Sequence, residues 1–256
     1  MTMLELSSLT RRFGDLVAVD HLDLSLPAGC LVGLLGANGA GKTTTLNMLT
    51  TLLEPTEGTA KVAGHDIRDD IMGVRRLFGY VPEHGAVYEG LSAREYLELA
   101  AVLHDLDPEV GRRRAERLLN HFDLSGVLDD RLASFSKGMR RKVLVTAALL
   151  HDPPVLFLDE PMDGLDVASQ RRLAELLLEL VAQGKTVLYS SHVLQQVEEI
   201  CQHLVLIHEG RLLWQGAVAE LRADHDGASL TDIFLSMTHQ DGEAPSSWSD
   251  LLGEGV

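Results

Sequence analysis

The chain is poor in cysteine and in positive charge, and both shortages narrow the classes of protein it can belong to. Its two cysteines, Cys30 and Cys201, are far apart and form no CxxC pair, so we interpret them as small buried apolar residues in a reducing compartment. The chain has only 22 Lys and Arg residues but 38 Asp and Glu residues, which gives it a net charge of -16. A negative field repels nucleic-acid backbones and anionic lipids, so broad binding to either is disfavoured.

Long apolar runs are absent as well. The best candidates, "KVLVTAALL" and "RLAELLLELVAQ", are too short for a membrane span or carry internal charges. The start, "MTMLELSSL", lacks the basic and then apolar pattern of a secretory signal. With 45% hydrophobic and 23% charged residues the composition is that of an ordinary globular protein. We expect a soluble, cytoplasmic protein, in which any membrane role comes through a partner.

Strand-like and helix-like patterns alternate along the chain. A continuous apolar run at 31–36 is typical of a strand buried on both faces, and "VLFLDE" (155–160) likewise predicts a buried strand. "TVLYSS" (186–191) predicts a further strand, and 77–82 predicts a short apolar one. Alternating patterns predict half-solvated strands at 3–9 and 16–26, and "LVLIHEGRLLWQG" predicts a hairpin turned at Glu209-Gly210. Helical patterns lie between the strands, including one over 193–204. Such alternation predicts an α/β fold with a mostly parallel sheet.

The rhythm is interrupted at about residues 91–150, where the periodicity is helical throughout. Ser92 and Glu95 form a capping-box pattern at the start of the first helix there. We therefore expect one domain over residues 3–225, with an N-terminal antiparallel β subdomain and an inserted α-helical subdomain. Residues 226–256 are expected to add a short helix at 229–238 and a mobile acidic tail.

The stretch "GANGAGKTT" (36–44) fits the phosphate-loop pattern G-x-x-x-x-G-K-[ST] and lies between a predicted buried strand and a predicted helix. Its glycines let backbone N–H groups surround phosphates, and the helix start adds positive potential. Lys42 can reach the outer phosphates, and the Thr43 hydroxyl can bind magnesium. Thr44 supplies a second hydroxyl for the inner phosphates. The alternative is a chance glycine-rich turn.

The run "VLFLDE" ends a buried strand with two carboxylates, Asp159 and Glu160. Adjacent strand residues point to opposite faces, so the two carboxylates have different roles. Asp159 suits a magnesium site beside Thr43, and Glu160 suits deprotonation of a water that attacks the γ-phosphate. The alternative is that strand ends are solvated and often acidic.

With these two motifs, the sequence resembles the nucleotide-binding subunit of ABC transporters, a P-loop NTPase, over roughly residues 3–220. "PMDGLD" (161–166) resembles the family's D-loop, and "SSHVL" (190–194) resembles its switch segment, with His192 placed to contact the γ-phosphate. "RRFGD" (11–15) resembles the adenine-stacking segment, with Phe13 where Tyr is usual, although Phe13 is otherwise an ordinary packing residue. The resemblance implies these nucleotide-binding residues: Phe13, Gly36, Ala37, Asn38, Gly39, Ala40, Gly41, Lys42, Thr43, Thr44, Ser136 and Gly138.

The last two of these lie in "SFSKGMRRK" (134–142), which resembles the family's signature Leu-Ser-Gly-Gly-Gln. The resemblance implies that Ser136 and the Gly138 backbone begin a helix whose N-terminus binds the γ-phosphate of an ATP held by a second protomer. Lys137 and Met139 depart from the usual Gly and Gln. We interpret the basic residues that follow partly as local positive potential and partly as a solvated helix face, and not as a nucleic-acid patch.

Residues 79–97 align with the family's Q-loop, with Glu83 in place of the usual Gln. A carboxylate there can bind metal but cannot donate an N–H, so Glu83 joins Thr43 and Asp159 as a predicted magnesium ligand. Glu83 together with the "SKGM" signature resembles the exporter branch that has a separate permease subunit.

The resemblance thus implies an ATPase with Lys42, Glu160 and His192 as catalytic residues, and with ATP and Mg²⁺ as cofactors. Its implied partners are an integral membrane permease and a second protomer, forming a homodimer peripheral to the inner or plasma membrane. Two alternatives stay open at this stage. One is an ABC ATPase that acts on ribosomes or DNA, which a single phosphate loop and an acidic chain disfavour. The other is a regulatory module without turnover, which the presence of Glu160 disfavours.

Overall fold

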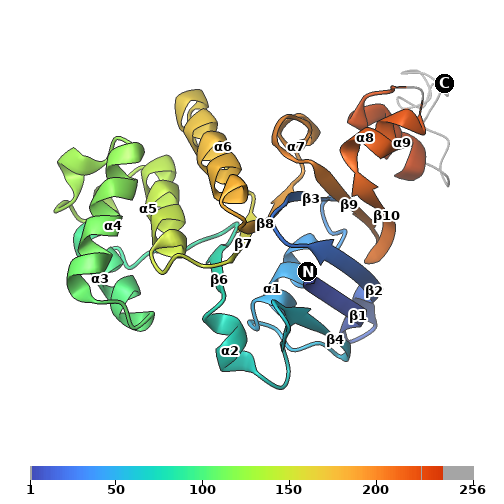
Figure 1. The fold of residues 1–256 in the computed structure, drawn as a ribbon, viewed down its shortest axis with the longest axis horizontal. Helices are drawn as coiled ribbons and strands as arrows, with labels where there is room; N and C mark the ends of the chain where they lie inside the picture. Colours follow the sequence, from blue (N-terminus) through green and yellow to red (C-terminus); the bar gives the residue numbers. More distant parts are fainter. Residues whose placement is uncertain (1, 226, 239–256) are drawn as a thin grey trace, which may run out of the picture.

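The computed structural model describes residues 2–225 and 227–238 and has a mixed α/β architecture with two sheets (Figure 1). The expected mobile tail after residue 239 lies outside the described residues. The strands are β1 (Thr2–Phe13), β2 (Leu16–Pro27), β3 (Leu31–Leu35), β4 (Glu57–Val62), β5 (His65–Asp66), β6 (Phe78–Val81), β7 (Val155–Asp159), β8 (Thr186–Ser191), β9 (His203–His208) and β10 (Arg211–Ala217). The α-helices are α1 (Lys42–Leu49), α2 (Ile71–Arg75), α3 (Ala93–Leu103), α4 (Pro108–His121), α5 (Lys137–Leu149), α6 (Val167–Ala182), α7 (Leu194–Ile200), α8 (Val218–Ala223) and α9 (Leu230–Thr238).

The larger sheet has the order β10-β9-β3-β8-β7-β6 and is parallel except for the β9–β10 hairpin. Every residue of β3, β7 and β8 is buried, as was predicted for β3 and β7 from their sequences. Because parallel strands end at the same edge of a sheet, the residues after β3, β6, β7 and β8 meet there. This edge brings the phosphate loop, Glu83, the acidic strand end and the switch segment together.

The N-terminal antiparallel subdomain is the smaller sheet, with the order β2-β1-β4-β5. Its β1–β2 hairpin is longer than predicted, because the two strands pair along almost their whole length, from Thr2 with Pro27 to Phe13 with Leu16. Phe13 therefore lies at the tip of this hairpin, where Gly14 turns the chain at φ 58°. One apolar core fills the space between the two sheets and α1.

The helical insert contains α3, α4 and α5, which lie at one end of the molecule away from the smaller sheet (Figure 1). These helices form an apolar core of their own. The predicted capping box is confirmed: the Ser92 N–H donates to Glu95 (2.8 Å) and the Glu95 N–H donates to the Ser92 hydroxyl (3.1 Å). Helix α5 also packs on β6, so the insert is joined to the parallel sheet through this helix.

Of three expectations for the C-terminal side, one is wrong and two are confirmed. The helix expected over 193–204 ends at Ile200, because Cys201 is extended and His203 begins β9, which pairs with β3. The predicted hairpin is confirmed and turns at Glu209 and Gly210, both with positive φ. Helix α9 matches the helix predicted at 229–238, and its Leu230 and Ile233 join the core on the α6–α7 side of the sheet. Within residues 2–225 and 227–238, no helix has the length and apolarity that crossing a bilayer requires.

Candidate active site

The phosphate loop connects β3 to α1 and depends on glycine at two close contacts. Gly41 caps α1 at φ 102°, and a Cβ there would lie 2.5 Å from the carbonyl oxygen of Ala18. A Cβ on Gly36 would lie 2.5 Å from the carbonyl oxygen of Ile207. Glycine is therefore required by the path of the backbone at both positions. The chance-turn alternative explains neither contact.

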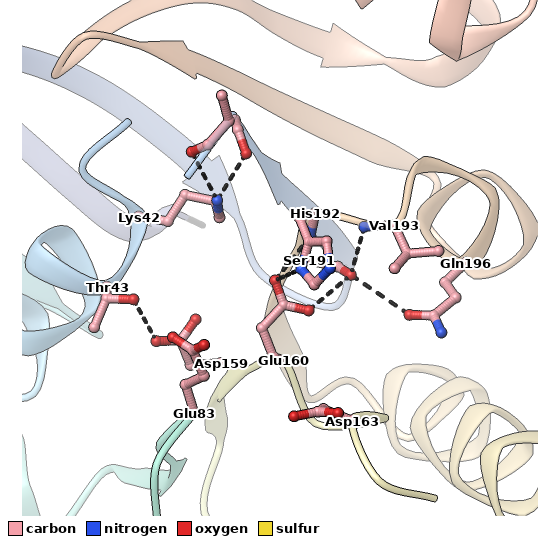
Figure 2. Close-up of polar contacts among 12 residues, drawn as sticks. Lys42, Thr43, Glu83, Asp159, Glu160, Asp163, Ser191, His192, Val193 and Gln196 are labelled. Carbon is pink, nitrogen blue, oxygen red and sulfur yellow. Dashed lines mark hydrogen bonds and ion pairs between the residues drawn. The ribbon is translucent and has the colours of Figure 1, made fainter. Parts of the chain in front are cut away.

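Lys42 is the buried cation of this loop, with its side chain folded back over it (Figure 2). Its Nζ donates to the carbonyl oxygens of Gly36 (2.7 Å) and Ala37 (3.1 Å). Burial lowers the pKa of the Lys42 ammonium, while the nearby carboxylates Glu160, Asp159 and Glu83 act in the opposite direction. The ammonium thus lies among carboxylates and loop carbonyls, where a phosphate group would supply further charge.

Asp159 is 1% exposed at the end of β7 and accepts a hydrogen bond from the Thr43 hydroxyl (2.8 Å) through Oδ2 (Figure 2). Burial raises the pKa of Asp159, and the bond from Thr43 opposes this. The other oxygen, Oδ1, is buried without a hydrogen-bond partner in the described part of the chain. A buried carboxylate oxygen without a partner, beside a hydroxyl, is the donor chemistry that a hard divalent cation takes up.

Glu160 follows Asp159 with φ 48°, an uncommon conformation for a residue with a side chain. Its carboxylate is held by the segment after β8. The backbone N–H and Nδ1 of His192 lie 2.8 and 2.7 Å from Oε1, and the Ser191 hydroxyl donates to Oε2 at 3.1 Å (Figure 2). The register explains the meeting, because Asp159 on β7 pairs with Ser190 on β8, so the next residues of both strands are neighbours. The two carboxylates, adjacent in sequence, thus have different partners, as predicted.

Ser191 is the part of this arrangement that sequence reasoning missed, although it lies within the predicted switch segment. It is fully buried and accepts from the Val193 N–H (3.1 Å), while the Oε1 of Gln196 lies 3.4 Å from its hydroxyl. Tyr189 donates to the same Gln196 oxygen (3.0 Å). Two further side chains, from β8 and α7, therefore support the residues that hold Glu160.

A cleft of about 470 Å³ unites these residues. Its lining consists of Phe13, Leu16, Ala18, Asn38, Gly39, Gly41, Lys42, Thr43, Thr44, Glu83, Asp159, Glu160 and His192. Phe13 is 45% exposed at the mouth, with the Arg11 guanidinium 4.6 Å from its ring centroid, so core packing does not account for it. Of the other predicted nucleotide-binding residues, Gly36 and Ala40 are buried and Ala37 is exposed, and none of the three lines the cleft. Ser136 and Gly138 also lie outside the cleft.

Ser136 is the N-cap of α5 and accepts the Met139 N–H at 3.2 Å, so the predicted helix start is confirmed. A Cβ on Gly138 would lie 2.6 Å from the carbonyl oxygen of Gly164, so glycine is needed for the close approach of α5 to residues 161–166. Lys137 forms a 2.6 Å ion pair with Asp163 in that segment, and this pair lowers the pKa of Asp163. The start of α5 and the loop after β7 therefore form one surface.

Among the four basic residues of this helix only Lys137 is exposed, so the solvated face that the sequence indicated is confined to that residue. Arg140 donates to the carbonyl oxygens of Leu132 (3.1 Å) and Ala133 (3.0 Å). Lys142 donates to the carbonyl oxygen of Phe122 at 3.3 Å. Arg141 is only 4% exposed. The charged side chains instead join α5 to its neighbours, which spacing along one helix could not predict.

Comparisons with known proteins agree with this site. A family profile described as "ABC transporter" matches residues 19–163. The chain is 36% identical over 240 residues to the ABC transporter ATP-binding protein NatA of Bacillus subtilis, covering 91% of this chain and 97% of that protein. It is 38% identical over 250 residues to the daunorubicin/doxorubicin resistance ATP-binding protein DrrA of Streptomyces peucetius, covering 98% and 76%.

Solved structures give the same result for the fold. The structure of an ATP-binding subunit of an ABC transporter superposes with a TM-score of 0.87 at 34% identity, covering 92% of this chain and 99% of that one. A dimeric ATP-binding cassette in a post-hydrolysis state, bound to ADP and phosphate, superposes with a TM-score of 0.78 at 24% identity, covering 84% and 99%. The second likeness shows the fold alone.

Proposed function

This chain belongs to the ABC transporter family, as an ATP-binding and ATP-hydrolysing subunit, and we propose that its cleft performs the hydrolysis with Lys42, Glu160 and His192 to drive a separate membrane permease. One observation carries the proposal. The cleft brings the buried Lys42 ammonium, the Thr43–Asp159 pair and the supported Glu160 carboxylate together from different strand ends. These are the groups that phosphoryl transfer to water requires.

Binding of the nucleotide is assigned to the phosphate loop and the hairpin tip. The N–H groups of residues 36–44 and the Lys42 ammonium hold the phosphates, where the start of α1 adds positive potential. Phe13 offers its ring to adenine at the mouth of the cleft. The triphosphate and the adenine ring are thus bound at opposite ends of one cleft.

Glu160 is assigned as the general base. Ser191 and the His192 backbone fix its carboxylate, so it accepts a proton from the attacking water in a defined orientation. Hydrogen bonding between Nδ1 of His192 and an ionised Glu160 requires a proton on Nδ1. The same ring is assigned to contact the γ-phosphate through its other nitrogen, Nε2.

Thr43 and Asp159 are assigned as the magnesium ligands, with Glu83 beside them. The residues fit a hard cation, because Oδ1 of Asp159 is buried without a partner among the described residues and the Thr43 hydroxyl is adjacent. No cluster of three or more His, Cys, Asp or Glu side chains suited to a metal occurs in the described part of the chain. A magnesium ion held by Thr43 and Asp159 would supply positive charge that offsets the negative charge of the phosphates.

The start of α5 is assigned to the nucleotide of a second copy of this chain. Ser136 and Gly138 lie outside the cleft of their own protomer but on a helix N-terminus, which favours an anion. Relatives named for daunorubicin resistance and for Nod factor export support an export direction and a permease partner at the membrane. Neither they nor NatA is named for work on ribosomes or DNA, so that alternative is not favoured.

The test is the oligomeric state of Glu160→Gln, measured by light scattering with and without Mg-ATP. The variant keeps the phosphate loop but lacks the base, so bound ATP is expected to persist and convert monomer to dimer. Glu175→Gln is the matched control, because it changes an exposed carboxylate on α6 outside the cleft and should stay monomeric while it hydrolyses ATP. A Glu160→Gln protein that binds ATP and remains monomeric would contradict the shared sites.

A further inference from the structure

Arg141 is a buried cation: its side chain points from α5 into the protein, and the residue is only 4% exposed. The side chain of Lys137, one turn earlier, is 66% exposed, and that of Arg140 is 32% exposed. Removing a guanidinium from water is costly, so a buried one is retained only where its hydrogen bonds and charge partners compensate. The contacts of Arg141 therefore indicate what it does.

Both terminal nitrogens of Arg141 donate to the segment that follows β6. Nη1 donates to the carbonyl oxygen of Pro82 and Nη2 to that of Glu83, each at 2.6 Å. Two parallel bonds from one planar guanidinium fix both position and orientation of the backbone they hold. The backbone held in this way is that of Glu83, whose side chain lines the nucleotide cleft together with Asp159 (Figure 2).

Helix α5 and strand β6 lie in contact over a matching length. A Cβ on Gly79 would lie 2.0 Å from the carbonyl oxygen of Ala148, so glycine permits the close approach at one end. Arg141 meets Pro82 at the other end. From Ala148 back to Arg141 the helix rises about 10 Å, and from Gly79 to Pro82 the strand advances about 10 Å. The helix therefore runs antiparallel to the strand, with a fixed contact at each end.

The charge of Arg141 also interacts with carboxylates of the nucleotide cleft. Burial lowers the pKa of its guanidinium, and carboxylates at the cleft and in the loop after β7 act against this shift: Asp163, Asp159, Glu83 and Glu160. Unlike Lys42, Arg141 does not line the cleft, but its charge acts on these four carboxylates. Arg141 thus offsets part of their mutual repulsion.

We propose that Arg141 is a positioning residue that holds Glu83 at the nucleotide cleft and ties it to the helix beginning at Ser136. A phosphate of the second protomer bound at that helix start is then coupled to Glu83 in the first protomer's cleft. This consequence rests on the proposed function, because it requires both the shared sites and a role for Glu83. The tie itself rests on the two hydrogen bonds alone.

The neighbouring Arg140 provides a matched control. It also donates to two successive carbonyl oxygens, those of Leu132 and Ala133, and it forms an ion pair with Glu89 (2.9 Å), but it does not bond the backbone at Pro82 and Glu83. Lysine at either position keeps the positive charge and loses the planar pair of donors. Arg141→Lys and Arg140→Lys therefore differ in whether the lost bonds held the backbone of Pro82 and Glu83.

The first measurement is amide hydrogen exchange of the peptide spanning residues 80–86, which excludes Glu89, in the full-length protein without nucleotide. Arg141→Lys should exchange at least about tenfold faster there than the unchanged protein, since the loop loses its anchor, whereas Arg140→Lys should not. Equal exchange in the two variants would overturn the tie, whatever the protein's activity. A melting curve like that of the unchanged protein ensures that local opening is compared and not global unfolding.

The second measurement is steady-state ATP hydrolysis in the cycle Glu83→Ala, Arg141→Lys and the double variant. Arg141→Lys should lower kcat by roughly 10- to 100-fold with the Kd for ATP within about twofold, since misplacement of a group by about 1 Å can have this effect. In the Glu83→Ala background the same substitution should lower kcat by less than about threefold. Equal losses in both backgrounds would overturn an action through Glu83. Normal turnover of Glu83→Ala would instead remove Glu83 from the proposed function, and the exchange result would still decide the tie.

Discussion

Two clefts lie beside β6, and they differ in the partners that they offer to buried titratable groups. At the carboxyl end of the strand, the nucleotide cleft contains Lys42, Asp159 and Glu160. Along the strand and α5, a second cleft of about 350 Å³ has a mainly apolar lining that includes Phe78, Leu144 and Ala148. The second cleft also contains His104 and His151, whose rings stack at 3.6 Å and 4°.

The difference lies in what compensates burial. In the nucleotide cleft the carboxylates accept hydrogen bonds from Thr43, Ser191 and His192, and cations lie nearby. In the apolar cleft burial lowers the pKa of both histidines, and for His151 to about 4, with the charge of His104 as a further cause. Charged groups are thus retained where partners are built in, and the apolar cleft keeps its imidazoles neutral at pH 7.

Among the substitutions that test this difference, the largest expected effect is on ATP turnover in the nucleotide cleft. Glu160→Gln should reduce kcat by about 1,000-fold or more, because the proposed general base is lost, while the Kd for ATP stays within about threefold. Single-turnover hydrolysis and nucleotide binding measure the two quantities, with Glu175→Gln as control. A variant that keeps more than about a tenth of the activity would assign the base to another residue.

The next effect is on binding. Lys42→Ala should weaken ATP binding by at least about 100-fold, because charge-assisted contacts to two phosphates are lost and the carboxylates around Lys42 lose their cation. Fluorescent-nucleotide titration measures this, and Lys61→Ala on exposed β4 is the control of equal charge change. Retained tight binding would refute the role of the phosphate loop.

The apolar cleft is tested by the dependence of the protein's stability on pH. Burial lowers the pKa of His151 from 6.5 to about 4, so below pH 6.5 the unfolded chain binds a proton that the folded chain does not. Stability should therefore fall as pH decreases from 6.5 toward 4, by at most about 2 kcal/mol at pH 5. Denaturant unfolding at pH 7.5 and 5.0 measures it. His151→Gln should remove this share of the dependence, and an unchanged pH dependence in the variant would contradict it.

The smallest effect is at the cleft mouth. Phe13→Ala should weaken ATP binding by about 1 kcal/mol, because one stacking face is lost, and should leave inorganic triphosphate binding unchanged. Phe13→Tyr should bind ATP like the unchanged protein. Competition titrations with both ligands separate base stacking from phosphate binding. Equal weakening of the two ligands would mean that Phe13 only supports the hairpin β1–β2.

Much of the fold and most of the cleft were predictable because their signals are local. The segments 31–36, 155–160 and 186–191 were predicted as strands, and β3, β7 and β8 fall within them. Elements with weaker signals were missed or misjudged: α2 and α8 are short, and the helix expected over 193–204 ends early because β9 pairs with β3. Strand pairing overrode the helical pattern there.

The sequence by itself determined the chemistry available to this protein: the glycines of the phosphate loop, the carboxylates after β7 and the serine that caps α5 are all readable within a few neighbouring residues. Only the tertiary structure decided which groups act on one another. Ser191 supports Glu160 because β7 and β8 are adjacent in register, and Arg141 reaches Glu83 because α5 runs back along β6. Such contacts join residues far apart in the chain, and they depend on how helices and strands pack, which no single stretch of sequence encodes.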